Sequence, residues 1–290
     1  MHGHRGRTTP LMVRGDGNNI DIHATLWQEA IMIGAIAGDI IGSVFEHHPI
    51  KTADFRLFGN GNKFTDDTVL TIAVAAAILD GRDYGEAMAD FAQRYPKAGY
   101  GGSFRNWVQS WDRKPYGSYG NGSAMRVSPV GWAFNTVSQV LREAQRSAEV
   151  THNHPEGNKG AQATALSILL ARQGKSKATI KKEITTRFGY DIDRTLAQIR
   201  PTYTFDVTCQ GSVPEAIIAF LESDSYEDAV RNAVSLGGDA DTQACIAGGI
   251  AEAFYGGVPA HFEEQVLPML PSDLRMVVDS FRKNFKQFGV

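Results

Sequence analysis

Apolar positions recur with helical spacing along most of the chain. From Trp27 onward, alanine-rich and aliphatic stretches are separated by short clusters of Gly, Pro, Asn and Asp, whereas alternating strand patterns are almost absent. The pattern predicts an all-α fold. The expected helices cover residues 27–45, 66–80, 85–95, 104–111, 138–150, 159–173, 177–188, 213–222, 226–236, 242–255 and 271–285.

The same pattern bears on domain organisation. No linker-like composition interrupts the helices, so we expect a single compact domain over residues 25–290. Residues 1–24 are polar, Gly-rich and aperiodic, which predicts a flexible N-terminal extension. The extension is either an inert tail or an arm that binds a partner through its apolar cluster at residues 11–13 and the nearby arginines.

Charge and cysteine content exclude several classes of protein. The chain has 29 Lys and Arg against 32 Asp and Glu, a net charge of −3, so nothing attracts it generally to nucleic acid or to an anionic membrane. The apolar run at 31–45 contains Asp39 and is shorter than the roughly 20 residues of a membrane helix. Cys209 and Cys245 have no disulfide or zinc-site spacing, and no secretory signal precedes them. We therefore expect a reducing, cytoplasmic location.

Glycines repeat every four residues on the first predicted helix, at Gly34, Gly38 and Gly42. Residues four apart share one face of a helix, so these glycines form a stripe without side chains. A glycine inside a helix costs about 1 kcal/mol relative to alanine. The stripe therefore predicts that another helix packs very closely there.

Paired acids open two of the predicted helices. Asp66 and Asp67 follow Thr65, while Asp239 and Asp241 lie between Gly238 and Thr242. Acids at a helix start act as caps, but capping requires one acid and not a doubled set. If the two helix starts face each other, four carboxylates converge, and their oxygens suit Mg²⁺, Mn²⁺ or Ca²⁺. At this point a metal site and paired caps both remain open.

Other segments carry weaker signals. Glu46 follows the first helix, where a carboxylate meets the unfavourable end of the dipole, so it is either functional or an exposed helix end. The glycine-rich segment 116–126 is either a phosphate-binding nest or a plain loop. Arg126 adds a cation there, or makes an internal salt bridge. The segment 151–155 could carry a second substrate contact or a general acid, whereas the alternative for His152 is a structural histidine.

Taken together, these segments resemble the ADP-ribosylglycohydrolase family, which includes the glycohydrolases that reactivate dinitrogenase reductase and the eukaryotic ADP-ribosyl-acceptor hydrolases. The resemblance covers about residues 30 to 290. It rests on Gly34-Ala35-Ile36-Ala37-Gly38-Asp39 with Gly42 and Glu46, on Phe64-Thr65-Asp66-Asp67-Thr68, and on Gly238-Asp239-Ala240-Asp241-Thr242. The family usually has threonine in place of Ala240, a position that is not a ligand.

The resemblance implies a compact orthogonal bundle of many helices and a centre of two Mg²⁺ or Mn²⁺ ions. The implied metal ligands are Thr65, Asp66, Asp67, Asp239, Asp241 and Thr242. The implied substrate-binding residues are Ser118, Tyr119, Gly120, Asn121, Gly122, Ser123 and His152. Glu46 falls beside the metals, and Glu46 or Asp241 would then manage the proton.

The activity that the resemblance implies is metal-dependent release of ADP-ribose from modified protein side chains, with arginine the favoured acceptor. Hydrolysis of O-acetyl-ADP-ribose, of ADP-ribosyl-serine or of another nucleoside-type substrate is the first alternative. A non-catalytic protein that binds ADP-ribose or blocks a partner is the second. Some bacterial relatives are antidotes to ADP-ribosylating toxins, so a cognate ADP-ribosyltransferase is an expected partner for the extension.

Overall fold

Every regular element is helical within residues 31–285, the part of the chain that the computed structural model describes. The β pairing found there is one isolated bridge between Gly120 and Thr208. The all-α prediction is therefore confirmed. The helices are α2 (Ile33–Gly42), α3 (Asp66–Asp80), α4 (Tyr84–Arg94), α5 (Gly102–Gln109), α6 (Gly122–Met125), α7 (Ser128–Ala133), α8 (Val137–Glu149), α9 (Pro155–Arg172), α10 (Lys177–Phe188), α11 (Leu196–Ile199), α12 (Cys209–Leu221), α13 (Tyr226–Val234), α14 (Ala240–Tyr255), α15 (Ala260–Val266), the 3₁₀ helix η1 (Leu267–Met269) and α16 (Ser272–Phe285).

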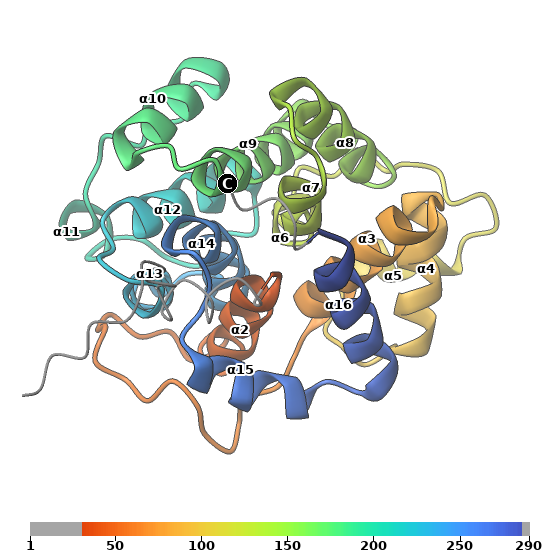
Figure 1. Cartoon of the computed structure of the whole chain (residues 1–290), viewed down its shortest axis with the longest axis horizontal. Helices are drawn as coiled ribbons and strands as arrows, with labels where there is room; N and C mark the ends of the chain where they lie inside the picture. Colours follow the sequence, from red (N-terminus) through yellow and green to blue (C-terminus); the bar gives the residue numbers. More distant parts are fainter. Residues whose placement is uncertain (1–30, 286–290) are drawn as a thin grey trace, which may run out of the picture.

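The close approach predicted from the glycine stripe occurs between α2 and α14. A Cβ atom on Gly38 would lie 2.1 Å from the carbonyl oxygen of Ala244, and one on Gly42 would lie 2.4 Å from that of Ala240. Figure 1 shows red-orange α2 and blue α14 side by side near the middle of the molecule. All ten residues of α2 are buried. This helix pair forms the centre of the core and places the start of α14 next to the end of α2.

Several helix boundaries differ from the prediction. Helix α2 ends at Gly42 and not at residue 45, so Glu46 lies in the turn that follows. Helix α12 begins at Cys209, earlier than expected, because the side chain of Thr208 accepts from the amide of Gly211 and caps it. Helix α9 begins at Pro155, a residue whose missing N–H costs nothing at the first helical position.

Short helices account for most of what the pattern does not predict. Helices α6, α7, α11 and α15 span four to seven residues, too few to show an apolar period. Helix α6 lies inside the glycine-rich segment, where a loop is expected, and Asn121 is its N-cap residue. The segment is therefore partly helical.

The predicted N-terminal extension and the predicted absence of a membrane helix are considered in turn against the described residues. Residues 1–24, and the expected domain boundary at residue 25, lie outside the described residues. None of the helices between residues 31 and 285 is both long enough and apolar enough to span a bilayer.

Candidate active site

The start of α3 carries the first pair of acids. Thr65 is the N-cap residue, and its side chain accepts from the amide of Asp67 at 3.2 Å. The amide of Asp66 donates to the carbonyl of Ala98 at 2.8 Å. The cap is thus a threonine hydroxyl, which leaves the carboxylates of Asp66 and Asp67 available for other partners.

Asp39 of α2 holds this helix start in place, although the sequence analysis does not single it out as a site residue. Its carboxylate is fully buried and accepts from the amide of Thr65 at 2.9 Å and from the hydroxyl of Thr65 at 2.6 Å. The amide of Thr68, at 3.1 Å, and its hydroxyl also donate to it. A single acid within an apolar helix must have hydrogen-bond partners when it is buried. The position of Asp39 in the apolar run of α2 is therefore the sequence feature that could have identified it. Burial raises the pKa of Asp39 to about 6, against the opposing effect of these hydrogen bonds.

The start of α14 carries the second pair of acids. Gly237 adopts a positive φ of 64°, and a Cβ atom on Gly238 would lie 2.3 Å from Cε1 of Tyr203, so glycine is required at both positions. Asp239 is the N-cap residue but makes no capping bond. Its Oδ2 instead accepts from Nδ2 of Asn121 at 2.8 Å. Paired caps therefore do not describe either helix start.

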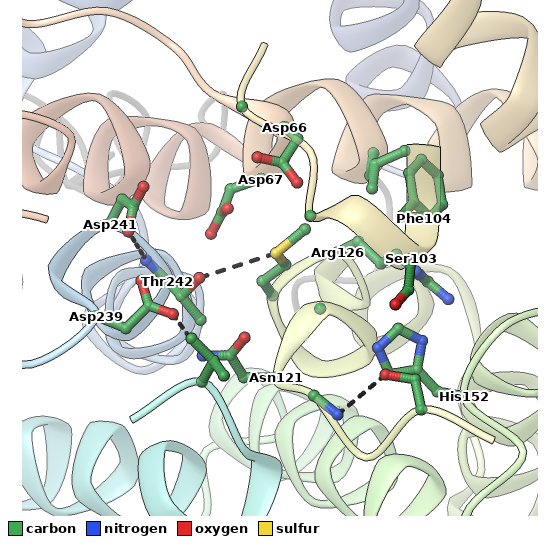
Figure 2. A pocket seen from close by; sticks show the side chains of 18 of the residues that line it. Asp66, Asp67, Ser103, Phe104, Asn121, Arg126, His152, Asp239, Asp241 and Thr242 are labelled. Atoms are coloured by element: carbon green, nitrogen blue, oxygen red, sulfur yellow. Dashed lines mark hydrogen bonds between the residues drawn. The ribbon is translucent and has the colours of Figure 1, made fainter. Parts of the chain in front are cut away.

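The two helix starts face each other. Carboxylate oxygens of Glu46, Asp239 and Asp241 lie within 4.8 Å of one another. A second group with the same spacing contains Asp39, Asp67 and Asp241. Figure 2 shows Asp66 and Asp67 on one side and Asp239 and Asp241 on the other, each pair projecting from its own helix. Three of the four predicted carboxylates, those of Asp67, Asp239 and Asp241, belong to these groups, whereas Asp66 lines the same cavity without belonging to either group.

Burial and mutual repulsion dominate the electrostatics of this cluster. Burial, followed by the charge of Asp39, raises the pKa of Asp66 to about 7. Burial and neighbouring carboxylates hold the pKa values of Asp67 and Asp241 well above their usual range. Oδ1 of Asp67 is buried without a hydrogen-bond partner. An unpartnered buried carboxylate oxygen among other acids fits a hard divalent cation, which relieves the repulsion.

Glu46 belongs to this cluster and is not an isolated residue beyond a helix end. Its side chain is 31% exposed, and Nε2 of His47 lies 3.8 Å from Oε2. Burial raises the pKa of Glu46, and the charge of Asp239 raises it further. The turn after α2 therefore adds a half-buried carboxylate beside the two helix starts.

A cavity of about 370 Å³ joins the acids to the glycine-rich segment. In Figure 2 the aspartates and Thr242 lie at one end, and His152 with Ser103 and Phe104 lies at the other. Of the predicted site residues, the cavity is lined by Glu46, Asp66, Asp67, Ser118, Gly120, Asn121, Gly122, His152, Asp239, Asp241 and Thr242. Most of the predicted residues therefore share one cavity.

Three predicted site residues do not line this cavity. The hydroxyl of Thr65 donates to Oδ1 of Asp39 at 2.6 Å. Ser123 is fully buried and donates to the carbonyl of Gly157 at 2.7 Å, because α6 turns its side chain toward α9. Tyr119 is 50% exposed, with its ring 5.3 Å from that of His154. Ser123 and Tyr119 are therefore not among the residues that line the cavity, and their role in substrate binding stays a prediction.

The cavity wall also contains residues that were not predicted from the sequence: Ser103, Phe104, Phe205 and Val207. Phe205 and Val207 come from a loop without periodicity, so only the folded chain identifies them. Arg126 is fully buried and lines the cavity, and its hydrogen bonds within the described residues go to Ser147 and Thr151 and not to a carboxylate. The alternative of an internal salt bridge is therefore not what the structure shows.

Comparisons with known proteins agree with this geometry. ADP-ribosylhydrolase ARH3 of Gallus gallus is 30% identical, over 82% of this chain and 86% of its own. ADP-ribosylarginine hydrolase Tri1 of Pseudomonas putida (strain GB-1) is 26% identical, over 81% of this chain and 72% of its own. A solved structure described as an ADP-ribosylglycohydrolase-related protein complex has the same fold, with a TM-score of 0.68 and 22% identity over 90% of this chain and 98% of its own.

The match to a family model extends over almost the whole chain. The model described as ADP-ribosylglycohydrolase matches residues 29–287, which include both helix starts and the glycine-rich segment. This chain belongs to the ADP-ribosylglycohydrolase family.

Proposed function

We propose that this protein is a metal-dependent hydrolase that releases ADP-ribose from modified protein side chains. The observation that carries the proposal is the convergence of carboxylates from α3, α14 and the turn after α2 at one end of a single cavity. The cavity volume of about 370 Å³ is within the range of small-molecule sites. Membership of a family of ADP-ribosyl hydrolases supports the same reaction.

The acids fit a pair of divalent ions. The proposed ligands are Thr65, Asp66, Asp67, Asp239, Asp241 and Thr242, and the proposed ions are two Mg²⁺ or Mn²⁺. All of these ligand atoms are oxygens, which hard cations prefer. When bound, such ions lower the pKa of a water molecule and polarise the ribose hydroxyls.

The residues of the chain would bind the substrate and move a proton. The glycine-rich segment and His152 would hold the diphosphate end of ADP-ribose, and the acids would receive the distal ribose, so that C1 of this ribose lies near Glu46. Burial and the charge of Asp239 raise the pKa of Glu46, which makes its carboxylate a stronger base and supports a role in proton transfer. Asp241 is the second candidate for this role, but it is more deeply buried than Glu46.

Arginine is the acceptor that we propose, because the printed name of the Pseudomonas putida relative specifies ADP-ribosylarginine. The protein partner would be an ADP-ribosylated target, and an antidote role toward a cognate ADP-ribosyltransferase is part of the same proposal. Only the acceptor and the target depend on this relative. The metal-dependent chemistry rests on the geometry of the site.

The test measures release of free ADP-ribose from arginine-modified protein, from serine-modified protein and from O-acetyl-ADP-ribose, each with and without a chelator. We expect fastest release from the arginine-modified protein and loss of release with the chelator. Release that persists with the chelator would contradict the metal-dependent mechanism. Release only from serine-modified protein or O-acetyl-ADP-ribose would replace the acceptor and leave the mechanism intact.

A further inference from the structure

At the end of the cavity opposite the acids, a hydrogen-bonded chain runs from Arg126 to His152. Nη2 of Arg126 donates to the carbonyl of Ser147 at 3.0 Å and to Oγ1 of Thr151 at 2.9 Å. Oγ1 of Thr151 lies 2.6 Å from Nδ1 of His152. Arg126 and Thr151 are fully buried, and His152 is 5% exposed. The three side chains therefore form a fixed unit rather than a solvated surface.

The direction of these hydrogen bonds follows from the chemistry of the groups. A guanidinium has only donors, so Oγ1 of Thr151 must accept from Arg126. A hydroxyl carries one proton, and Nδ1 of His152 is the other group within hydrogen-bonding distance of this oxygen among residues 31–285. The hydroxyl therefore donates to Nδ1. An imidazole nitrogen that accepts carries no proton, so the ring proton of neutral His152 is on Nε2.

The ring is held neutral. Burial lowers the pKa of His152 well below its usual value, and the charge of Arg126 lowers it further. A neutral ring in the Nε2–H form is a hydrogen-bond donor that brings no second charge to the site. This is the form that can pair with an acceptor oxygen of a ligand.

Nε2 lies beside the glycine-rich segment. It would be 3.4 Å from a Cβ atom on Gly122 and 3.6 Å from one on Gly120, so the two glycines leave this edge of the ring uncovered. No described residue forms a hydrogen bond with Nε2, and His152 lines the cavity. Figure 2 shows the ring facing the interior of the cavity. The unpaired donor thus lies where a ligand would pass.

We infer that Arg126 and Thr151 are positioning residues that fix His152 in its Nε2–H form, so that it donates to a phosphate oxygen of the bound diphosphate. The buried guanidinium behind the ring favours an anionic acceptor over a neutral one. The identity of this ligand rests on the proposed function. The tautomer does not, because it follows from the hydrogen bonds of the free protein.

The test uses Thr151→Val, which keeps the shape of the side chain and removes the hydroxyl, and Thr151→Ser, which restores it. Thr164→Val is the matched control, because Thr164 is also buried and its hydroxyl has no hydrogen-bond partner. The ¹⁵N shifts of the imidazole report which nitrogen carries the proton, and loss of the signal in His152→Gln identifies the resonance. Calorimetry with ADP-ribose on the Mg²⁺-loaded proteins reports affinity.

We expect wild type, Thr151→Ser and Thr164→Val to show protonated Nε2 and unprotonated Nδ1. Thr151→Val should show a mixture of the two tautomers and bind ADP-ribose about tenfold more weakly, the typical cost of a hydrogen bond to a charged group. Protonated Nδ1 of His152 in the wild-type protein would overturn the inference, and this outcome does not depend on the folding of Thr151→Val. A Thr151→Val protein with unchanged tautomer and affinity would also overturn it.

Failure of the proposed function gives a different result. A wild-type protein that does not bind ADP-ribose, but whose His152 carries its proton on Nε2, would refute the proposed ligand and retain the positioning role of Arg126 and Thr151.

Discussion

Single acids in the site differ in how many donors the protein gives them. Asp39 accepts from the amides and hydroxyls of Thr65 and Thr68, so both of its carboxylate oxygens have hydrogen-bond partners within the fold. Asp67 is almost as deeply buried, yet its Oδ1 has no partner. Both carboxylate oxygens of Asp39 therefore have partners in the protein, whereas Oδ1 of Asp67 has none among the described residues.

Replacing Asp67 should separate metal binding from folding. Because burial and repulsion raise the pKa of Asp67, ionising it destabilises the metal-free protein, and Asp67→Asn should melt at or above the wild-type temperature without metal. Added Mn²⁺ should raise the melting temperature of the wild type and not that of Asp67→Asn. Thermal melts with and without Mn²⁺ measure both effects. Exposed Asp54→Asn is the control, and an equal Mn²⁺ shift in Asp67→Asn would contradict its assignment as a ligand.

Glu46 should affect rate more than stability. Its side chain is partly exposed in the turn after α2, so Glu46→Gln loses no core packing. We expect hydrolysis to slow by about 10²-fold or more, the usual contribution of general acid–base catalysis, with ADP-ribose affinity within a few-fold of wild type. Single-turnover rates and calorimetry check the two parts. A wild-type rate at every pH would exclude a role in proton transfer.

The contact between helices α2 and α14 depends on glycines at positions where the two backbones meet. Carbonyl oxygens of one helix touch the glycines of the other, so the backbones approach more closely than side chains would allow. Two neighbouring glycines of α14 differ in this respect. A Cβ atom on Gly248 would lie 2.4 Å from the carbonyl oxygen of Gly34, but one on Gly249 would find its nearest neighbours at 3.5 Å.

These neighbouring positions give a matched pair of substitutions. Gly248→Ala should lower the free energy of unfolding by about 1 to 3 kcal/mol, because the helices must separate. Gly249→Ala adds an ordinary contact and improves helix propensity, so it should be neutral or stabilising by up to about 1 kcal/mol. Urea denaturation measures both. Equal effects of the two substitutions would show that the close approach does not determine stability here.

At the scale of helices, the sequence predicts the features that neighbouring residues in the chain determine, such as helix starts and ends. Helix α3 and helix α10 match their predicted bounds, since each has a capping side chain at its start and a glycine after its end. The acids at the starts of α3 and α14 are likewise visible as doubled pairs. Phe205, Val207 and Ser103 are not predictable, because their place in the cavity depends on how distant segments pack. The hydrogen bonds that bury Arg126 depend on α8 in the same way.

The molecule as a whole concentrates ionisable groups in its interior, which couples stability to pH. The pKa values of Asp39 and Asp66, about 6 and about 7, lie above that of an aspartate in the unfolded chain, about 3.9. Between these values the folded protein binds more protons than the unfolded chain, so stability falls as pH rises.

We therefore expect the melting temperature of the metal-free protein to fall between pH 5 and pH 7.5, by on the order of 5 °C. Mg²⁺ at pH 7.5 should reverse much of the fall, because bound cations favour the ionised acids. Scanning calorimetry at both pH values checks this, and Asp66→Asn should reduce the dependence. A melting temperature that rises with pH in the metal-free protein would contradict the role of these acids.

Removing residues 1–24 tests the predicted extension. These residues lie outside the described chain and outside the family match, which begins at residue 29. We expect the shortened protein to hydrolyse ADP-ribosyl substrates at the wild-type rate. If the extension is an arm, affinity for a cognate ADP-ribosyltransferase should fall, and titration calorimetry with the catalytic site inactivated measures it. Equal affinities would identify an inert tail.

The pairing of α2 with α14 also has a consequence for how the protein folds. Gly38 and Ala244 lie in contact although most of the described chain separates them in sequence, so a very large loop must close before these helices meet. Helical proteins usually fold quickly because their contacts are local, and this contact predicts slower folding than in a simple bundle. Before α14 has emerged from the ribosome, Asp239 and Asp241 are also missing from the folding part of the nascent chain. If these acids bind metal ions as proposed, the ions would bind late in folding, after α14 has packed against α2.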